Sequence, residues 1–132
     1  MLMFFVSGLI SCSGAPGQII DRWLTEEFVL FITPDILDEL KRVLDYPRLK
    51  QRIRSETTDF LLTALARLAE QKPGTLRLSP LEADPSDTIY LICAVEAEAN
   101  YFVTGNLDHF QEVEQANIGL QIISPRAFLD LL

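Results

Sequence analysis

The chain has 132 residues, of which 48% are hydrophobic and 23% are charged, and its formal net charge is −8. This length and apolar content suffice for one core, so we expect a single domain over residues 1–132. The negative charge excludes a protein that holds nucleic acid by a broad basic face, so any role on nucleic acid must be catalytic or local.

The first twelve residues, "MLMFFVSGLISC", admit two interpretations. The final cysteine resembles a lipid-attachment site, but no Lys or Arg precedes it, and Ser7 and Gly8 interrupt the apolar run, so a secretion signal is not favoured. The run is also too short to span a bilayer. We therefore interpret residues 1–6 as a buried strand and expect a cytoplasmic protein with no membrane contact.

Apolar runs of strand length alternate with helical patterns after this strand. Pro16 stands in the first turn of a predicted helix, and "FVLFIT" (28–33) reads as a strand buried on both faces. The segment "TPDILDELKRVLDYP" predicts a helix with Thr33 as its N-cap, Pro34 as its first residue and Pro47 as its end.

Six basic residues follow one another closely in and after this helix. A solvated helical face explains them, and a surface that meets a phosphate backbone is the alternative. These residues are Lys41, Arg42, Arg48, Lys50, Arg52 and Arg54.

The alternation continues to the end of the chain. A helix is predicted over 55–71 because its leucines and alanine recur at helical spacing, and "TLRLS" (75–79) alternates as a short strand. The remaining predicted elements are a mostly apolar helix from "DPSD" to about Glu98, a strand at 101–104, a short helix "LDHFQEV", a strand at 120–124 and a terminal helix "PRAFLDLL".

This order of elements predicts an α/β fold, arranged as three α/β/α layers around a mostly parallel sheet of about five strands. In such sheets the ligand binds outside the carboxyl ends of the strands. The chain has no GxGxxG, GxxxxGK[ST] or GxSxG motif, so dinucleotide, P-loop and hydrolase sites lose their usual support. Cys12 and Cys93 form no recurrent zinc motif with the single His109 and are expected to be reduced thiols.

The strand ends offer carboxylates. Glu39 borders the buried stripe of the helix after the second strand, whereas Asp38 points to solvent. A carboxylate at this border is costly unless it meets a cation or hydrogen-bond donors. Two interpretations stay open: Glu39 belongs to a site, or it reaches the surface and pairs with Arg42 or Lys41.

Two further segments carry acids with the same ambiguity. In "DPSD", Asp84 reads as an N-cap, whereas Asp87 shares a helical face with Leu91 and so competes between a cap and a site. In "VTGNLDHF", the buried strand ends at Thr104. Asn106 and Asp108 then follow, either as the rim of an active site or as ordinary capping residues.

Glu39, Asp87 and Asp108 each follow a different predicted strand, so our hypothesis is that they converge on one edge of the sheet. Carboxylates that share one cleft repel each other unless a divalent cation binds, and Mg²⁺ or Mn²⁺ prefers such an oxygen shell. A cation held in this way generates hydroxide and stabilises charge on a phosphodiester. The predicted chemistry is therefore metal-dependent phosphodiester hydrolysis.

Four segments in order give the chain a family resemblance: "SGLIS", "TPDILDELKRVLDYPRL", "DPSDTIYLICAVEAEANYFVTGNLDHF" and "SPRAFLDLL". It resembles PIN-domain proteins, specifically the toxin components of bacterial toxin–antitoxin pairs. The resemblance implies an endoribonuclease that uses Mg²⁺ or Mn²⁺, cuts an RNA substrate, binds a cognate antitoxin protein and forms a homodimer. It assigns Glu39, Asp87 and Asp108 to catalysis and metal binding. It gives supporting roles to Ser7, Asp84, Thr104 and Asn106.

The sequence departs from this family at two places. Relatives usually carry Asp-Thr-Asn at the end of the first strand, where this chain has Met1, Leu2 and Met3, and relatives of this subgroup often have aspartate at the position of Asn106. Either the enzyme is degenerate, or the true start lies upstream and supplies the acid. Loss of that ligand predicts weak activity. A catalytically silent PIN fold that binds an antitoxin or itself is the alternative function.

Overall fold

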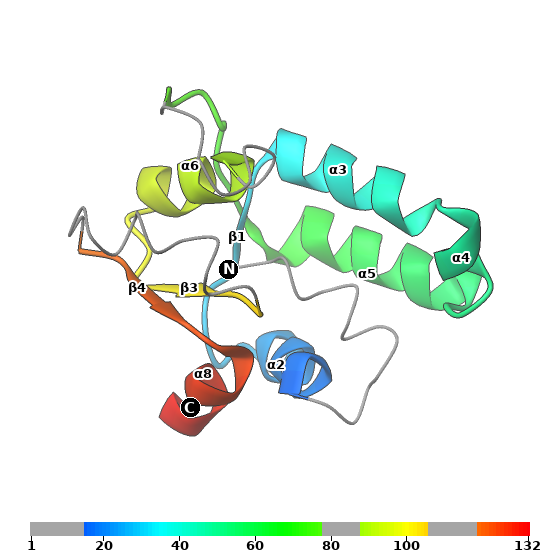
Figure 1. Ribbon diagram of the computed structural model, residues 1–132, viewed down its shortest axis with the longest axis horizontal. Coiled ribbons are helices and arrows are strands. Elements are labelled where there is room, and N and C mark those ends of the chain that lie inside the picture. Colours follow the sequence, from blue (N-terminus) through cyan, green and yellow to red (C-terminus); the bar gives the residue numbers. More distant parts are fainter. Residues whose placement is uncertain (1–14, 78–87, 106–118) are drawn as a thin grey trace.

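The computed structural model describes residues 15–77, 88–105 and 119–132 (Figure 1). The predicted strand at 1–6 and the predicted helix "LDHFQEV" lie outside the described residues. The elements are α2 (Ala15–Leu24), β1 (Phe31–Ile32), α3 (Pro34–Leu44), α4 (Pro47–Lys50), α5 (Ser55–Leu68), β2 (Glu70–Gln71), α6 (Thr88–Glu96), β3 (Tyr101–Val103), β4 (Gln121–Ile123) and α8 (Pro125–Leu131).

The strands pair in parallel. β1 pairs with β2 in the register Phe31 opposite Glu70, and β3 pairs with β4 in the register Phe102 opposite Ile122. Figure 1 shows α2 and α8 together on one side of the strands and α6 on the other. This arrangement confirms an α/β fold with parallel pairing. A single sheet of about five strands stays a prediction, because the described residues contain two separate pairs.

α3 forms as its local sequence predicts. The Thr33 hydroxyl accepts a hydrogen bond from the Ile36 N–H at 3.2 Å, and Pro34 occupies the first turn, where its missing N–H costs nothing. Asp38 is exposed, as expected. The expected role of Pro47 is wrong in one respect: α3 already ends at Leu44, and Pro47 begins the short helix α4.

α5 is shorter than the predicted helix over 55–71. Leu61 and Leu65 are buried, but Leu68, predicted to face the core, is 58% exposed because the helix ends there. After this end, the Glu70 N–H donates to the Leu30 carbonyl at 2.8 Å, and the Lys72 N–H donates to Ile32 in the same way. Pairing with β1 therefore takes the backbone groups that a longer helix would have used.

The expectation of a strand at 75–79 is also wrong where the structure describes that segment. Thr75, Leu76 and Arg77 belong to no strand. The N–H groups of Thr75 and Leu76 donate to the carboxylate of Glu96 instead of to a neighbouring strand. A side chain on α6 thus replaces the ladder that alternation alone predicts.

The main core cluster lies between α2, β1, α3, α5 and α6. It includes Trp23, Ile32, Leu40, Leu65 and Cys93. Cys93 is a free thiol, as expected, and burial raises its pKa to about 11. Within the described ranges, no helix has the length and apolar character needed to cross a membrane.

Candidate active site

The structure describes two of the predicted site residues, Glu39 and Thr104. Within the described part of the chain, no three His, Cys, Asp or Glu side chains gather closely enough to hold a metal ion. The convergence of Glu39 with two further acids therefore stays a prediction. The predicted site residues outside the described residues are Ser7, Asp84, Asp87, Asn106 and Asp108.

Glu39 lies in the middle of α3 and forms an ion pair with Arg42, which follows one turn later. Arg42 Nη2 lies 2.5 Å from Glu39 Oε1, and Arg42 Nε donates to Oε2 at 3.2 Å. Arg42 also donates to the hydroxyl of Tyr46 and lies over its ring, 5.6 Å from the centroid. The hydrogen bond and the charge of Glu39 raise the pKa of Arg42. Of the two interpretations from sequence, the structure displays the pairing with Arg42.

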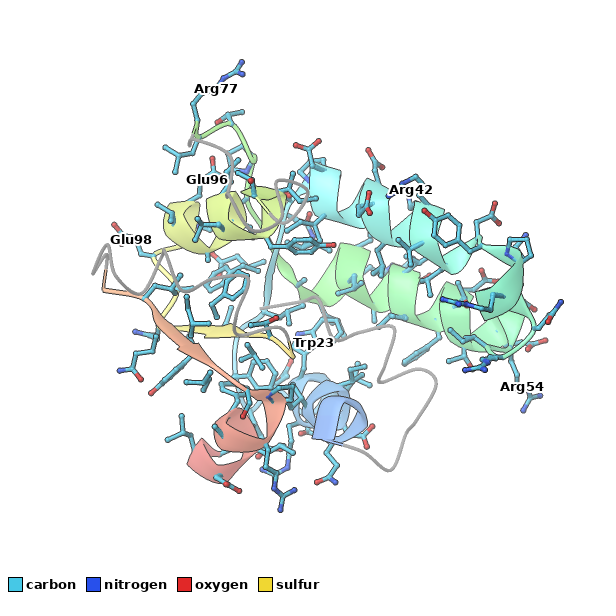
Figure 2. The ribbon with its side chains drawn as sticks, in the orientation of Figure 1. Trp23, Arg42, Arg54, Arg77, Glu96 and Glu98 are labelled. Carbon is cyan, nitrogen blue, oxygen red and sulfur yellow. The ribbon has the colours of Figure 1, made fainter. Side chains whose placement is uncertain are left out.

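This ion pair leaves Glu39 available to a cation. The Glu39 side chain is 30% exposed, and the Arg42 side chain is 57% exposed, on the outer side of α3 (Figure 2). An arginine with this exposure exchanges readily between protein and water, because surface ion pairs contribute little to stability. A divalent ion that bound Glu39 would therefore compete with one guanidinium for the same two oxygen atoms.

The carboxyl end of β1 is closed by a tight approach of two chain segments. A Cβ added to Gly74 would lie 3.1 Å from Cβ of Thr33, the residue that links β1 to α3. Gly74 also has a φ of +71°, a conformation that side chains rarely adopt. The position therefore requires glycine for two reasons, and the loop after β2 is held against the start of the helix that carries Glu39.

Glu96 fixes this loop from the other side. Its carboxylate accepts hydrogen bonds from the N–H groups of Gly74 at 2.7 Å, Thr75 at 2.9 Å and Leu76 at 3.0 Å. Figure 2 shows Glu96 on α6 below the segment that leads to Arg77. Loss of hydration raises the pKa of Glu96, but the backbone hydrogen bonds lower it by more, so its pKa lies below the ordinary value.

Sequence reasoning missed this anchor. The "KPG" tripeptide before Thr75 is typical of a turn and was an available signal for the loop. Nothing in the sequence near Glu96 indicated that its partners are 20 to 22 residues away.

Thr104 lies where it was expected, at the carboxyl end of β3. It is fully buried, and its N–H donates to the Ile123 carbonyl at 3.0 Å, which extends the β3–β4 ladder by one residue. Thr33 and Thr88 are also buried, at the end of β1 and the start of α6. Buried threonines therefore support the strand ends and helix starts that frame the predicted site.

An apolar cavity of about 510 Å³ lies at the opposite, amino ends of β1 and β3. Its lining includes Val29 and Tyr101, and the rings of Phe28 and Phe128 meet edge to face there, with centroids 5.0 Å apart. No described residue that lines this cavity is acidic. The cavity therefore has no group suited to hydrolytic chemistry, and the carboxyl edge near Glu39 is the better candidate.

Comparison with known proteins gives a family match. A family model described as "PIN domain" matches residues 3–108, a range that contains Glu39 and the positions of Asp87 and Asp108. An uncharacterized protein of Methanocaldococcus jannaschii, MJ1680, is 26% identical over 133 residues, which are 96% of this chain and 84% of the relative. No solved structure matches the chain.

Proposed function

This chain belongs to the PIN domain family, whose members are generally nucleases, and we propose that it is a metal-dependent endoribonuclease. The observation that carries the proposal is the family match, since it spans all three predicted catalytic acids. The position of Glu39 supports it, because a half-buried carboxylate on the helix after β1 lies at the edge where parallel sheets bind ligands. The substrate is RNA, and the biological role is that of the toxin in a toxin–antitoxin pair.

The proposed cofactor is Mg²⁺ or Mn²⁺, with Glu39, Asp87 and Asp108 as its ligands. The donor chemistry suits these ions, because all three residues present carboxylate oxygens. When bound, the ion supplies an activated water and stabilises charge on the phosphodiester. In the chain itself, Thr33 caps the helix that presents Glu39, and Arg42 holds the Glu39 carboxylate in one orientation.

The finer parts of the proposal follow the family resemblance. We place the protein in the cytoplasm, as a homodimer that binds a cognate antitoxin, with Ser7, Asp84, Thr104 and Asn106 in supporting roles. Relatives carry an acid where this chain has Met1 to Met3, so we propose that its activity is weakened.

The test is RNA cleavage by the purified protein with Mn²⁺, using structured and unstructured RNA. Glu39→Gln removes the proposed ligand, and Asp38→Asn removes one negative charge from an exposed neighbour on the same helix. We expect cleavage by the parent and by Asp38→Asn, and its loss in Glu39→Gln. Equal cleavage by the parent and Glu39→Gln would show that the activity is a contaminant or uses another site.

A second candidate is a catalytically silent PIN fold that acts by binding an antitoxin or itself. The observation that favours it is the engagement of both Glu39 oxygens by Arg42. This candidate predicts that Mn²⁺ leaves the melting temperature unchanged and that the protein forms a stable complex with the product of a small neighbouring gene. A melting temperature that rises with Mn²⁺ in the parent but not in Glu39→Gln would contradict it.

A further inference from the structure

Positive charge is concentrated in one part of this acidic protein. Residues 41–54 contain six basic residues and one acidic residue, Asp45, whereas the whole chain has a net charge of −8. This range covers the end of α3, all of α4 and the turn into α5. Figure 1 shows these three helices as an arm that extends away from the strands. The arm therefore offers a local basic surface on a chain that otherwise repels polyanions.

A polar cavity of about 580 Å³ lies in this arm, between α3, the end of α4 and the first turns of α5. Three cations line it: Lys41, Lys50 and Arg54. Lys50 Nζ is paired with Asp45 at 2.7 Å, and Asp59 is the other acid of the lining.

Lys41 and Arg54 are the cations of this cavity that remain for an anion. Lys41 is exposed and has no ion pair among the described residues, while Arg54 reaches Glu56 only at 3.8 Å and is 86% exposed. Two cations thus face Asp59 once Lys50 and Asp45 have neutralised each other.

The beginning of α5 adds hydrogen-bond donors to the same wall. Ser55 and Thr58 line the cavity, and no side chain caps the first turn of α5. The uncapped N–H groups and the helix dipole favour negative charge at this end. Hydroxyl donors, free N–H groups and flexible cations together are the groups that bind a phosphate oxygen.

The cavity is separate from the proposed catalytic edge. Lys41 follows Glu39 by two residues, which turns it about 200° around α3, so the two side chains leave opposite flanks of the buried stripe. Figure 2 likewise shows Arg42, the partner of Glu39, and Arg54 on opposite sides of the arm. A ligand in the cavity would affect binding rather than chemistry at Glu39.

We propose that this cavity binds a phosphate group of the RNA backbone and so holds the substrate on the arm. The proposal rests on the proposed ribonuclease function for the identity of the polyanion. Its physical basis is the cavity, its cations and its donors, which read no base and therefore bind RNA without regard to sequence.

The experiment measures RNA binding in a chain that does not cut. A fluorescently labelled single-stranded RNA of mixed sequence is titrated with Glu39→Gln protein over a series of KCl concentrations, and the affinity is read by anisotropy. Lys41→Gln and Arg54→Gln are added together to remove both available cations. The matched control combines Arg67→Gln, exposed farther along α5, with Arg126→Gln on α8, which makes the same change of net charge outside the cavity.

We expect the cavity variant to bind about tenfold more weakly and the control to change little. The salt slope of the cavity variant should fall by about 0.7 for each RNA phosphate that the protein no longer neutralises. Asp59→Asn should tighten binding, because it removes the acid that opposes the phosphate, while Asp130→Asn on α8 should not. Equal weakening by the cavity variant and the control would overturn the proposal.

Inorganic phosphate supplies the last arm of the test. Binding of inorganic phosphate alone, at constant ionic strength and as tightly as the RNA, would mean a free-anion site and would also overturn the proposal. Because binding is measured without cleavage, a protein that binds RNA at the cavity but never cuts it contradicts the ribonuclease function alone. A protein that cuts RNA but shows no difference between the cavity variant and the control contradicts this inference alone.

Discussion

The carboxylate of Glu96 accepts the N–H of Gly74 at 2.7 Å and thereby ties the end of α6 to the loop after β2. The same carboxylate also accepts the next two backbone N–H groups. Because Gly74 lies against Thr33, this one side chain fixes the segment that covers the start of α3. The loop is therefore held by an ionised group, and its order depends on pH.

We predict that the stabilising effect of Glu96 is lost in acid. The hydrogen bonds place its pKa in the folded protein below the ordinary value of 4.5, so its contribution is complete above that value. The contribution falls away as the pH drops through the lower, folded-state pKa. The melting temperature of Glu96→Gln should therefore lie below that of the parent by a constant amount between pH 6 and 8, and the two should converge below about pH 4. A difference that stays unchanged into acid would show that the charge of Glu96 is not what holds the loop.

Gly74→Ala is predicted to destabilise the fold more than alanine at two other glycines. At Gly74 the positive φ costs about 1 to 2 kcal/mol, and the new Cβ also presses on Thr33. At Gly119 the φ of +79° imposes the conformational cost, but nothing lies within 4 Å of the added Cβ. At Gly105 neither cost applies, so Gly105→Ala should be neutral or slightly stabilising. Urea unfolding of the three variants gives the order, and equal effects at Gly74 and Gly119 would mean that Thr33 yields freely.

Glu98→Gly is predicted to stabilise the protein. Helix α6 ends in a Schellman motif, in which the Glu98 N–H donates to Val95 at 3.1 Å and the Ala99 N–H donates to Ala94 at 3.0 Å. Glu98 occupies the left-handed position with a φ of +51°, where glycine has no steric penalty. After allowance for the greater chain entropy of glycine, the expected gain is about 0.5 to 1 kcal/mol. Glu98→Ala removes the same charge without relieving the backbone, so a gain of equal size from alanine would contradict this explanation.

The sequence predicted those elements whose signals are local. For α3, the cap at Thr33, Pro34 at the first turn and the helical spacing of the apolar residues all agree, and the helix begins where they indicate. The parallel pairing also followed from the alternation of strands and helices. The alternative partner proposed for Glu39 was correct because Arg42 lies one helical turn away on the same face.

The sequence did not predict the elements that depend on distant partners. Glu70 and Gln71 have no apolar pattern, and they form β2 only because the carbonyl groups of Leu30 and Ile32 accept the N–H groups beside them. The same is true of the loop held by Glu96. The predicted meeting of Glu39 with Asp87 and Asp108 is a relationship of this second kind, and it stays a prediction.

Arg42→Gln provides a test of whether Glu39 serves a cation. In the parent, the guanidinium occupies both carboxylate oxygens, so a metal ion must displace it and also bind beside its positive charge. Removing that charge should tighten Mn²⁺ binding about fivefold, measured by calorimetry, while the melting temperature without metal changes little because the pair is exposed. Arg67→Gln, which removes an exposed positive charge from α5, is the matched control and should leave Mn²⁺ affinity unchanged. If Arg42→Gln weakens Mn²⁺ binding or leaves it the same, then Glu39 is a surface partner of Arg42 and not a metal ligand, because a like charge next to a cation site cannot help the cation to bind.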